Sequence, residues 1–232
     1  YGRNTEIIYY DVTNYYFEID KGDDLRKLGL SKENRRNPIV QMGLAMDADG
    51  IPIHYELFSG NTVDKNTFRP IIGEIKRNYD TDKIIVVADM GIITGDNIYY
   101  LLGNEKGRNF NGYVFSFSVK GGTNDFKKYV LSDNDYVDKD GKAAGKNTDF
   151  KVKSRVIARD INVTLQSGRI VKKTVYEKQV VFWSRKYATK AKADREEILK
   201  KAYDLVTDPK KYTKATSYGA AKYVKNLNFD KK

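Results

Sequence analysis

A short apolar run near the middle of the chain limits the folds that this sequence can adopt. Residues 84 to 88 of the stretch KIIVVADMGI are all apolar, and the stretch then turns away at a glycine. A run of this length is typical of a strand that is buried on both faces, as in a partly parallel sheet. The sequence therefore predicts an α/β fold around residues 83 to 92.

The segments on either side of this run supply the other elements of such a sheet. Residues 5 to 19 have the composition of a strand, and NPIVQMGLAMDADGIPIHYELF predicts two more strands joined at the turn signal DADG. From Asp64 onward, apolar residues recur with a helical period up to Tyr79, which predicts a first helix. A second helix is expected over residues 95 to 103. With GYVFSFSV as a fifth strand, the predicted order of the mixed sheet, βββαβαβ, is complete by residue 119.

The chain divides by composition near residue 120. Residues 1 to 120 carry 15 Lys and Arg against 17 Asp and Glu, a net charge of −2, whereas residues 121 to 232 carry 27 against 14, a net charge of +13. We therefore expect a core domain over 1–120 and a basic region over 121–232. Alternating apolar and polar residues predict that the basic region is β-rich, with a closing helix at 191 to 206. That helix is expected to carry one apolar stripe, formed by Ile198, Leu199, Ala202, Tyr203, Leu205 and Val206.

Lysines in the basic region are interleaved with aromatic residues, as in FKKYV and FWSRKYATK. This composition is expected of a surface that follows a phosphate backbone, so we predict contact with nucleic acid. The alternative is an ordinary solvated lysine surface. The residues predicted to contact the nucleic acid are Lys127, Lys128, Lys172, Lys173 and Arg185.

Two aspartates lie where strands are expected. Asp11 lies inside IIYYDVTNYYFEI, although aspartate is disfavoured in strands, and Asp89 directly follows the apolar run. The carboxyl end of a buried strand is where ligands bind in open α/β sheets. If the first and fourth strands are neighbours, the two carboxylates face each other and attract a divalent cation. The alternatives are a tight turn at DVTN, which would split the first strand into a hairpin, and a turn-capping role for Asp89.

The rest of the composition restricts the metal that such a site can hold. The sequence has no cysteine and one histidine, His54, so it can serve only hard cations with oxygen ligands. Two strand-borne acids and a basic second region indicate Mg²⁺-dependent phosphoryl chemistry on nucleic acid, with Mn²⁺ as a substitute ion. No apolar run approaches the roughly 20 residues of a membrane span, and no leader is present, so we expect a cytoplasmic protein without a membrane partner.

Three stretches, YYDVTNYYFE, PIVQMGLAMDADGIPIHYELFSGNTVDKNTF and IIVVADMGI, resemble the DDE transposases of the IS4-like insertion sequences. The resemblance covers residues 5 to about 120. It implies an RNase H-like catalytic core that is interrupted by a β-rich insertion, which the basic region matches in position and composition. It also implies that Asp11 and Asp89 are catalytic ligands of Mg²⁺ on neighbouring strands. Gly91 matches a glycine often found just after the second Asp.

The family also carries a glutamate on a late helix, in the pattern Tyr, two residues, Arg, three residues, Glu, six residues, Lys. The nearest approach in this sequence, Tyr187, Lys190, Asp194 and Lys201, replaces both the Arg and the Glu. We therefore expect a fragment that stops before the third acid, with the core incomplete at its C-terminus.

The function implied by the resemblance is metal-dependent cleavage and strand transfer at transposon ends, with double-stranded DNA, at the ends and at the target, as the partner. We expect this fragment to be inactive alone. A homodimer is a candidate assembly for the full-length protein. Two alternatives remain, an RNase H-like nuclease that cuts without joining and a non-catalytic DNA-binding module.

Overall fold

The computed structural model describes residues 2–29, 37–81, 83–103, 111–208, 220 and 223–224. The chain forms two compact units, one made of Tyr1–Val130 and Ala158–Val175 and the other of Leu131–Ile157 and Tyr176–Lys232. This division differs from the single boundary expected at residue 120. The reason is a long hairpin, whose distal half belongs to the first unit and whose base belongs to the second.

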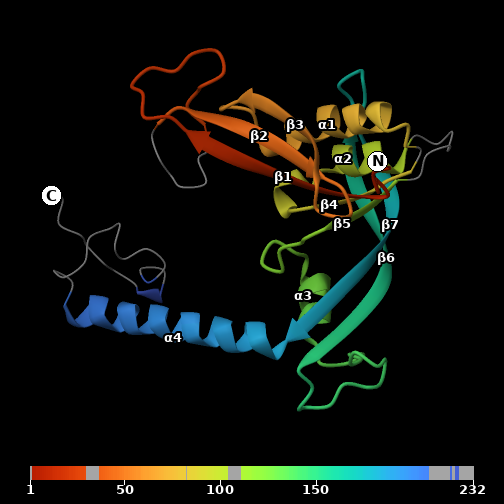
Figure 1. Cartoon of the computed structure of the whole chain (residues 1–232). Coiled ribbons are helices and arrows are strands. Elements are labelled where there is room, and N and C mark those ends of the chain that lie inside the picture. The colour runs from red at the N-terminus through yellow and green to blue at the C-terminus, as the bar shows by residue number, and fades with distance from the viewer. Residues whose placement is uncertain are drawn as a thin grey trace. The chain divides into compact units, whose positions relative to one another are not determined.

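A five-stranded mixed sheet forms the centre of the first unit, which confirms the predicted α/β class (Figure 1). The sheet has the order β3-β2-β1-β4-β5. β2 pairs antiparallel with β1 and β3, whereas β4 pairs parallel with β1 and β5. β1 runs without a break through Asp11, so the alternative of a tight turn at DVTN is wrong. The strands are β1 (Ile7–Tyr16), β2 (Ile39–Met46), β3 (Pro52–Ser59), β4 (Ile85–Ala88) and β5 (Gly112–Phe115).

Two helices, α1 (Asp64–Asn78) and α2 (Gly95–Leu102), pack on one face of this sheet. The helical period of the sequence is confirmed in α1, where the apolar positions form one fully buried stripe. Burying each such side chain stabilises the unit by about 1.5 to 3 kcal/mol relative to leaving it exposed. The buried positions of α1 are Phe68, Ile71, Ile72 and Ile75, and their main partners in the sheet are Ile8, Tyr10, Val12, Val86 and Ala88.

The opposite face of the sheet is exposed, although several of its side chains are apolar. Val114 is 58% exposed and Tyr55 is 65% exposed, and along β4 buried residues alternate with more exposed ones. The expected burial of this strand on both faces is therefore not observed within the described residues. Both helices of the sheet's own crossovers cover the same face, which a run of apolar residues cannot reveal.

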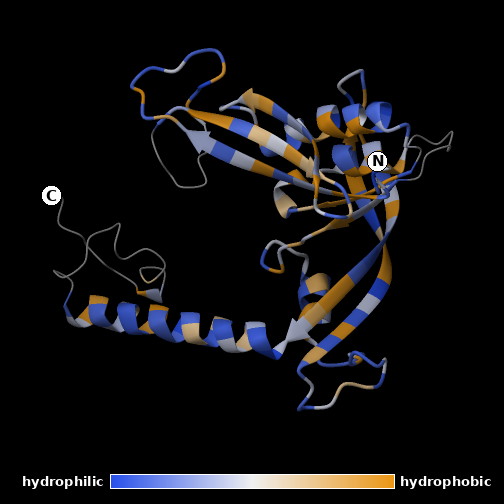
Figure 2. Ribbon diagram, in the orientation of Figure 1, coloured by the Kyte–Doolittle hydropathy of each residue, from blue (hydrophilic) through white to orange (hydrophobic). Residues whose placement is uncertain are grey.

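The hairpin consists of β6 (Phe150–Thr164) and β7 (Ile170–Ser184), and these two strands form a sheet of their own. Its distal half packs on α2 within the first unit, where Ile161, Val163 and Val175 form one hydrophobic cluster with Ile98. Asp96, in the first turn of α2, accepts a 2.6 Å hydrogen bond from the backbone N–H of Thr164. Hydrophilic and hydrophobic residues alternate along both strands, as the sequence predicted (Figure 2).

A short helix, α3 (Asn124–Leu131), lies in a segment where only β-structure was expected. Thr123 starts it, since the Thr123 hydroxyl accepts a 3.2 Å hydrogen bond from the N–H of Phe126. The Phe126 ring packs edge-to-face against Phe117, with ring centroids 5.2 Å apart. The sequence signal for this helix was the threonine followed by Asn124 and an acid in the first turn.

The second unit contains the base of the hairpin and the helix α4 (Arg185–Thr207), which is largely hydrophilic (Figure 2). The single apolar stripe expected on α4 is split. Ile198, Ala202 and Leu205 pack with Ala220 and Val224. Leu199, Tyr203 and Val206 are 51 to 70% exposed, because each lies about 100° further round the helix. Among the described residues, no helix is long and apolar enough to cross a membrane.

Candidate active site

Asp11 lies in the middle of β1 and faces away from the helices. Its neighbours Tyr10 and Val12 are buried against α1, whereas Asp11 itself is exposed, because successive side chains of a strand point to opposite faces. Its partner in β2 is Leu44. The position therefore tolerates an ionised carboxylate inside a strand, since the side chain reaches solvent.

Asp89 lies directly after β4 and starts the 3₁₀ helix η1 (Met90–Ile92). Its backbone is still extended, with φ −79° and ψ 169°. One carboxylate oxygen, Oδ1, accepts a 2.7 Å hydrogen bond from the N–H of Met90 and a short hydrogen bond from the hydroxyl of Ser116. The turn-capping role considered for Asp89 is thus real, and the carboxylate remains exposed while it fills that role.

The strand register places the two aspartates on adjacent strands, level with the carboxyl end of β4. Tyr10 is paired with Ala88 on the adjacent parallel strand, so the next residues along, Asp11 and Asp89, are neighbours across the two strands. Both are exposed and both follow a buried residue, which places them on the same face. Carboxylates in this arrangement suit a hard divalent cation.

A buried asparagine holds the turn that carries Asp89. Asn97 is 2% exposed, and its Nδ2 donates 3.0 Å hydrogen bonds to the carbonyl oxygens of Lys65 and Ile92. Its Oδ1 accepts a 3.1 Å hydrogen bond from Nε of Arg69. Asn97 therefore joins η1 to the first turns of α1 and α2. Sequence reasoning missed this residue, because nothing local distinguishes it from a surface asparagine.

Tyr10 anchors the strand that carries Asp11. Its hydroxyl lies 2.5 Å from the hydroxyl of Thr67, which donates a 2.7 Å hydrogen bond to the carbonyl oxygen of Asp64 at the start of α1. Burial raises the pKa of Tyr10 well above its ordinary value, and the negative charges of Asp64 and Asp11 add to the effect. The neutral phenol therefore serves as a structural link between β1 and α1.

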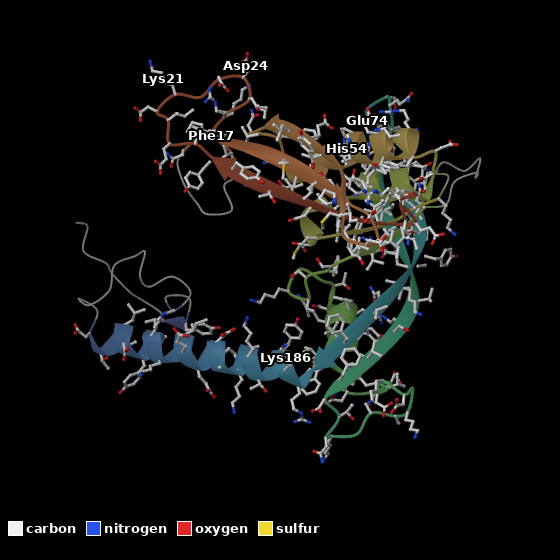
Figure 3. All side chains as sticks on the ribbon, in the orientation of Figure 1. Phe17, Lys21, Asp24, His54, Glu74 and Lys186 are labelled. Atoms are coloured by element: carbon white, nitrogen blue, oxygen red, sulfur yellow. The ribbon has the colours of Figure 1, made fainter. Side chains whose placement is uncertain are left out.

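Two other residues considered at the sequence level also lie in the first unit. Gly91 is within η1, and a methyl group on it would make only ordinary contact with Asp64, at 3.5 Å, so the close packing of the turn does not require a glycine there. His54, labelled in Figure 3, is half-buried on β3, in register with Ala45 and hence with Tyr10. It belongs to the face of the sheet opposite Asp11.

The five basic residues predicted to contact nucleic acid are divided between the two units. Lys127 and Lys128 lie on α3 and Lys172 and Lys173 on the distal half of β7, all in the first unit. Lys173 lies 5.9 Å from the centre of the Tyr99 ring. Arg185, the first residue of α4, belongs to the second unit and forms a 2.6 Å ion pair with Asp149.

The second unit holds a buried lysine that sequence reasoning did not single out. Lys153 is 3% exposed, lies 4.4 Å from the centre of the Tyr136 ring and donates a 2.5 Å hydrogen bond to the carbonyl oxygen of Ser132. Burial lowers the pKa of Lys153 below its ordinary value of 10.5. Lys151 lies over the same ring and pairs with Asp133 at 2.9 Å. These contacts of Lys151 and Lys153 stabilise the folded base of the hairpin.

The described residues hold no group of three or more His, Cys, Asp and Glu side chains that could bind a metal ion. The near-match to the family's late helix falls on α4, in the second unit, and includes Tyr187, Lys190, Asp194 and Lys201. In the first unit, Asp11 and Asp89 are related by the strand register alone, each following a residue of the pair Tyr10 and Ala88.

Comparison of the chain with protein-family models, with curated proteins and with solved structures gave no match. The described residues form a mixed α/β fold with two exposed aspartates on adjacent strands, level with the carboxyl end of β4.

Proposed function

We propose that this chain carries two catalytic carboxylates, Asp11 and Asp89, of a DDE-type DNA transposase with an RNase H-like core. The observation that carries the proposal is their placement, one step beyond the last paired residues of two adjacent parallel strands and on the same exposed face. The position of β1 beside β4 also agrees with what the family resemblance implies. The basic region supplies positive charge for a DNA partner.

The donor atoms of the two aspartates fit Mg²⁺, or Mn²⁺ in its place. Asp11 and Asp89 offer carboxylate oxygens, which are the ligands that these ions prefer, and the sequence offers no cysteine that would favour a softer metal. When bound, such ions activate the water or 3′-hydroxyl that attacks the phosphodiester and stabilise the departing oxygen. The residues of the chain bind and orient, since the aspartates supply negative charge and the hydrogen bonds on Asp89 hold its carboxylate in place.

Two carboxylates are too few to hold the two ions of this mechanism about 3.5 to 4 Å apart. We therefore propose that cleavage and strand transfer require a further acidic ligand. The two rival functions make different demands on the same residues. A nuclease would cut DNA without joining it, whereas a non-catalytic DNA-binding module would use Asp11 and Asp89 only as structural groups.

The test of the metal site is a titration of the chain with Mn²⁺, followed by electron paramagnetic resonance of the free ion. We expect one weak site that is lost in Asp11→Asn and in Asp89→Asn. The matched control is Asp49→Asn, which removes an exposed carboxylate in the turn between β2 and β3. Equal Mn²⁺ binding by all four proteins would contradict the proposed site.

The test of the reaction is incubation of the chain with Mg²⁺ and with duplex DNA that ends in the terminal sequence of the parent transposon. We expect the chain to bind this DNA and not to cleave it efficiently. Efficient cleavage that persists in both Asn variants would place the chemistry at another site. Cleavage that depends on both aspartates, but never yields joined strands, would instead favour the nuclease.

A further inference from the structure

Ser116 lies beside Asp89 although 27 residues separate them in sequence. β4 and β5 are parallel, with Ala88 paired to Phe115, so the next residue along β5 stands next to Asp89. The N–H of Ser116 donates a 3.4 Å hydrogen bond to the carbonyl oxygen of Ala88, and its hydroxyl donates to Oδ1 of Asp89. Asp11, Asp89 and Ser116 thus follow one another across three adjacent parallel strands.

The two hydrogen bonds on Oδ1 come from different parts of the chain. The Met90 N–H belongs to the turn that follows Asp89 itself, and it would hold the carboxylate only relative to that turn. The Ser116 hydroxyl belongs to the neighbouring strand, and it ties the same oxygen to the sheet. Donors that orient a metal-binding carboxylate typically change metal affinity 10- to 100-fold when they are removed.

We propose that Ser116 is a positioning residue of the Asp11 and Asp89 site, which orients the Asp89 carboxylate for a divalent cation. This inference rests on the proposed function, because it assigns the hydroxyl a role in metal binding. Ser116 is exposed, lies directly after β5 and contributes little to the core. If its role were purely structural, replacing it would therefore have little effect on stability.

The experiment compares Ser116→Ala with Ser116→Thr, which keeps the hydroxyl. Ser118→Ala is the matched control, because it removes a serine hydroxyl two residues further along. Mn²⁺ binding is measured as above on all of these proteins. We expect Ser116→Ala to weaken Mn²⁺ binding by about 10- to 100-fold. We expect Ser116→Thr and Ser118→Ala to bind within about twofold of the original chain, and wild-type affinity in Ser116→Ala would overturn the proposal.

A second readout needs no metal. Three-bond NMR couplings from Cγ of Asp89 to its backbone N and C′ atoms report the χ1 rotamer of this side chain. We expect a single rotamer in the original chain and in Ser116→Thr, and averaging between rotamers in Ser116→Ala. If the original chain binds no Mn²⁺, the proposed function fails. The positioning role is then decided by these couplings alone, and an unchanged single rotamer in Ser116→Ala would refute it.

Discussion

The hydroxyl groups of Tyr10 and Thr67 lie 2.5 Å apart, and this contact joins the strand of Asp11 to the helix that begins at Asp64. Tyr10 is 3% exposed and its ring packs edge-to-face on Phe68, with centroids 5.6 Å apart. A polar group so deeply buried is stabilising only while it is hydrogen-bonded. The pair therefore constrains β1 and α1 at the position next to the candidate site.

Replacing Tyr10 with phenylalanine tests this contact. The ring is kept and only the hydroxyl is lost, while Thr67 can still donate to the carbonyl oxygen of Asp64. We expect the free energy of unfolding to fall by about 1 kcal/mol, as is usual for one hydrogen bond, measured by urea denaturation. The control is Tyr9→Phe, because Tyr9 is 40% exposed, and it should change stability by less than about 0.5 kcal/mol. Equal effects of the two substitutions would show that the buried hydroxyl of Tyr10 contributes no more to stability than the exposed hydroxyl of Tyr9.

The raised pKa of Tyr10 predicts a loss of stability in alkali. An unfolded tyrosine ionises near pH 10, whereas the folded state keeps Tyr10 neutral, so above that pH the unfolded state binds fewer protons than the folded one. The free energy of unfolding should therefore fall as pH rises through about 10, by up to about 1.4 kcal/mol per pH unit for this group. Tyr10→Phe should show a shallower fall between pH 9 and 11, and an identical pH dependence would argue against the shift.

Asn97 is the residue on which the turn of Asp89 depends most. In Asn97→Ala the carbonyl oxygen of Ile92 loses its side-chain donor in a buried setting, and that of Lys65 loses one in a partly buried setting. We expect a destabilisation of about 2 to 3 kcal/mol, from urea denaturation, because unsatisfied buried polar groups cost about 1 to 3 kcal/mol. Asn66→Ala, at an exposed position on α1, should be nearly neutral. A small effect in Asn97→Ala would mean that water replaces the amide.

Gly95 decides whether the hairpin can pack on α2. A methyl group at Gly95 would lie 2.0 Å from the carbonyl oxygen of Asn162, a backbone atom that cannot turn aside. Gly95→Ala should therefore destabilise the first unit by more than about 1 kcal/mol and increase hydrogen exchange in the distal half of the hairpin. Gly73→Ala, in the middle of α1 with its nearest neighbour at 3.5 Å, should instead stabilise by about 0.5 to 1 kcal/mol. Similar effects at the two glycines would contradict this packing.

Charge reversal tests the DNA interface. The variant with Lys127, Lys128, Lys172 and Lys173 changed to Glu should bind duplex DNA more weakly, and its affinity should fall less steeply with salt. Each lost phosphate contact lowers the slope of log K against log salt by about 0.9. The control is Lys21→Glu, because Lys21, labelled in Figure 3, is exposed and lies outside the basic region. An unchanged slope in the fourfold variant would identify these lysines as a solvated surface. Arg185 is less suited to this test, because its reversal also breaks the ion pair with Asp149.

The local pattern of residues was sufficient to predict most elements of the first unit. The short-range properties are the strand-like composition of β1, the turn at DADG and the helical spacing of Phe68, Ile71 and Ile75. The corresponding elements are present. The register between strands also follows from local pattern once two strands are known to be neighbours, because a slip of one residue would turn Asp11 into the core. The position of Asp89 at the end of a strand could also be predicted from local pattern, because the apolar run stops directly before it.

What the pattern could not supply was which segments meet in space. Asp89 and Ser116 come together because two crossover connections place β4 between β1 and β5, and neither serine nor aspartate carries a local sign of that contact. Lys153 is buried because a turn from elsewhere in the chain covers it, although lysine is ordinarily a surface residue. The apolar stripe of α4 divides because, within the part of the chain that the structure describes, only one side of it packs against other residues. Periodicity in the sequence reports which face of an element is apolar, and tertiary packing decides which of those faces is covered and by what.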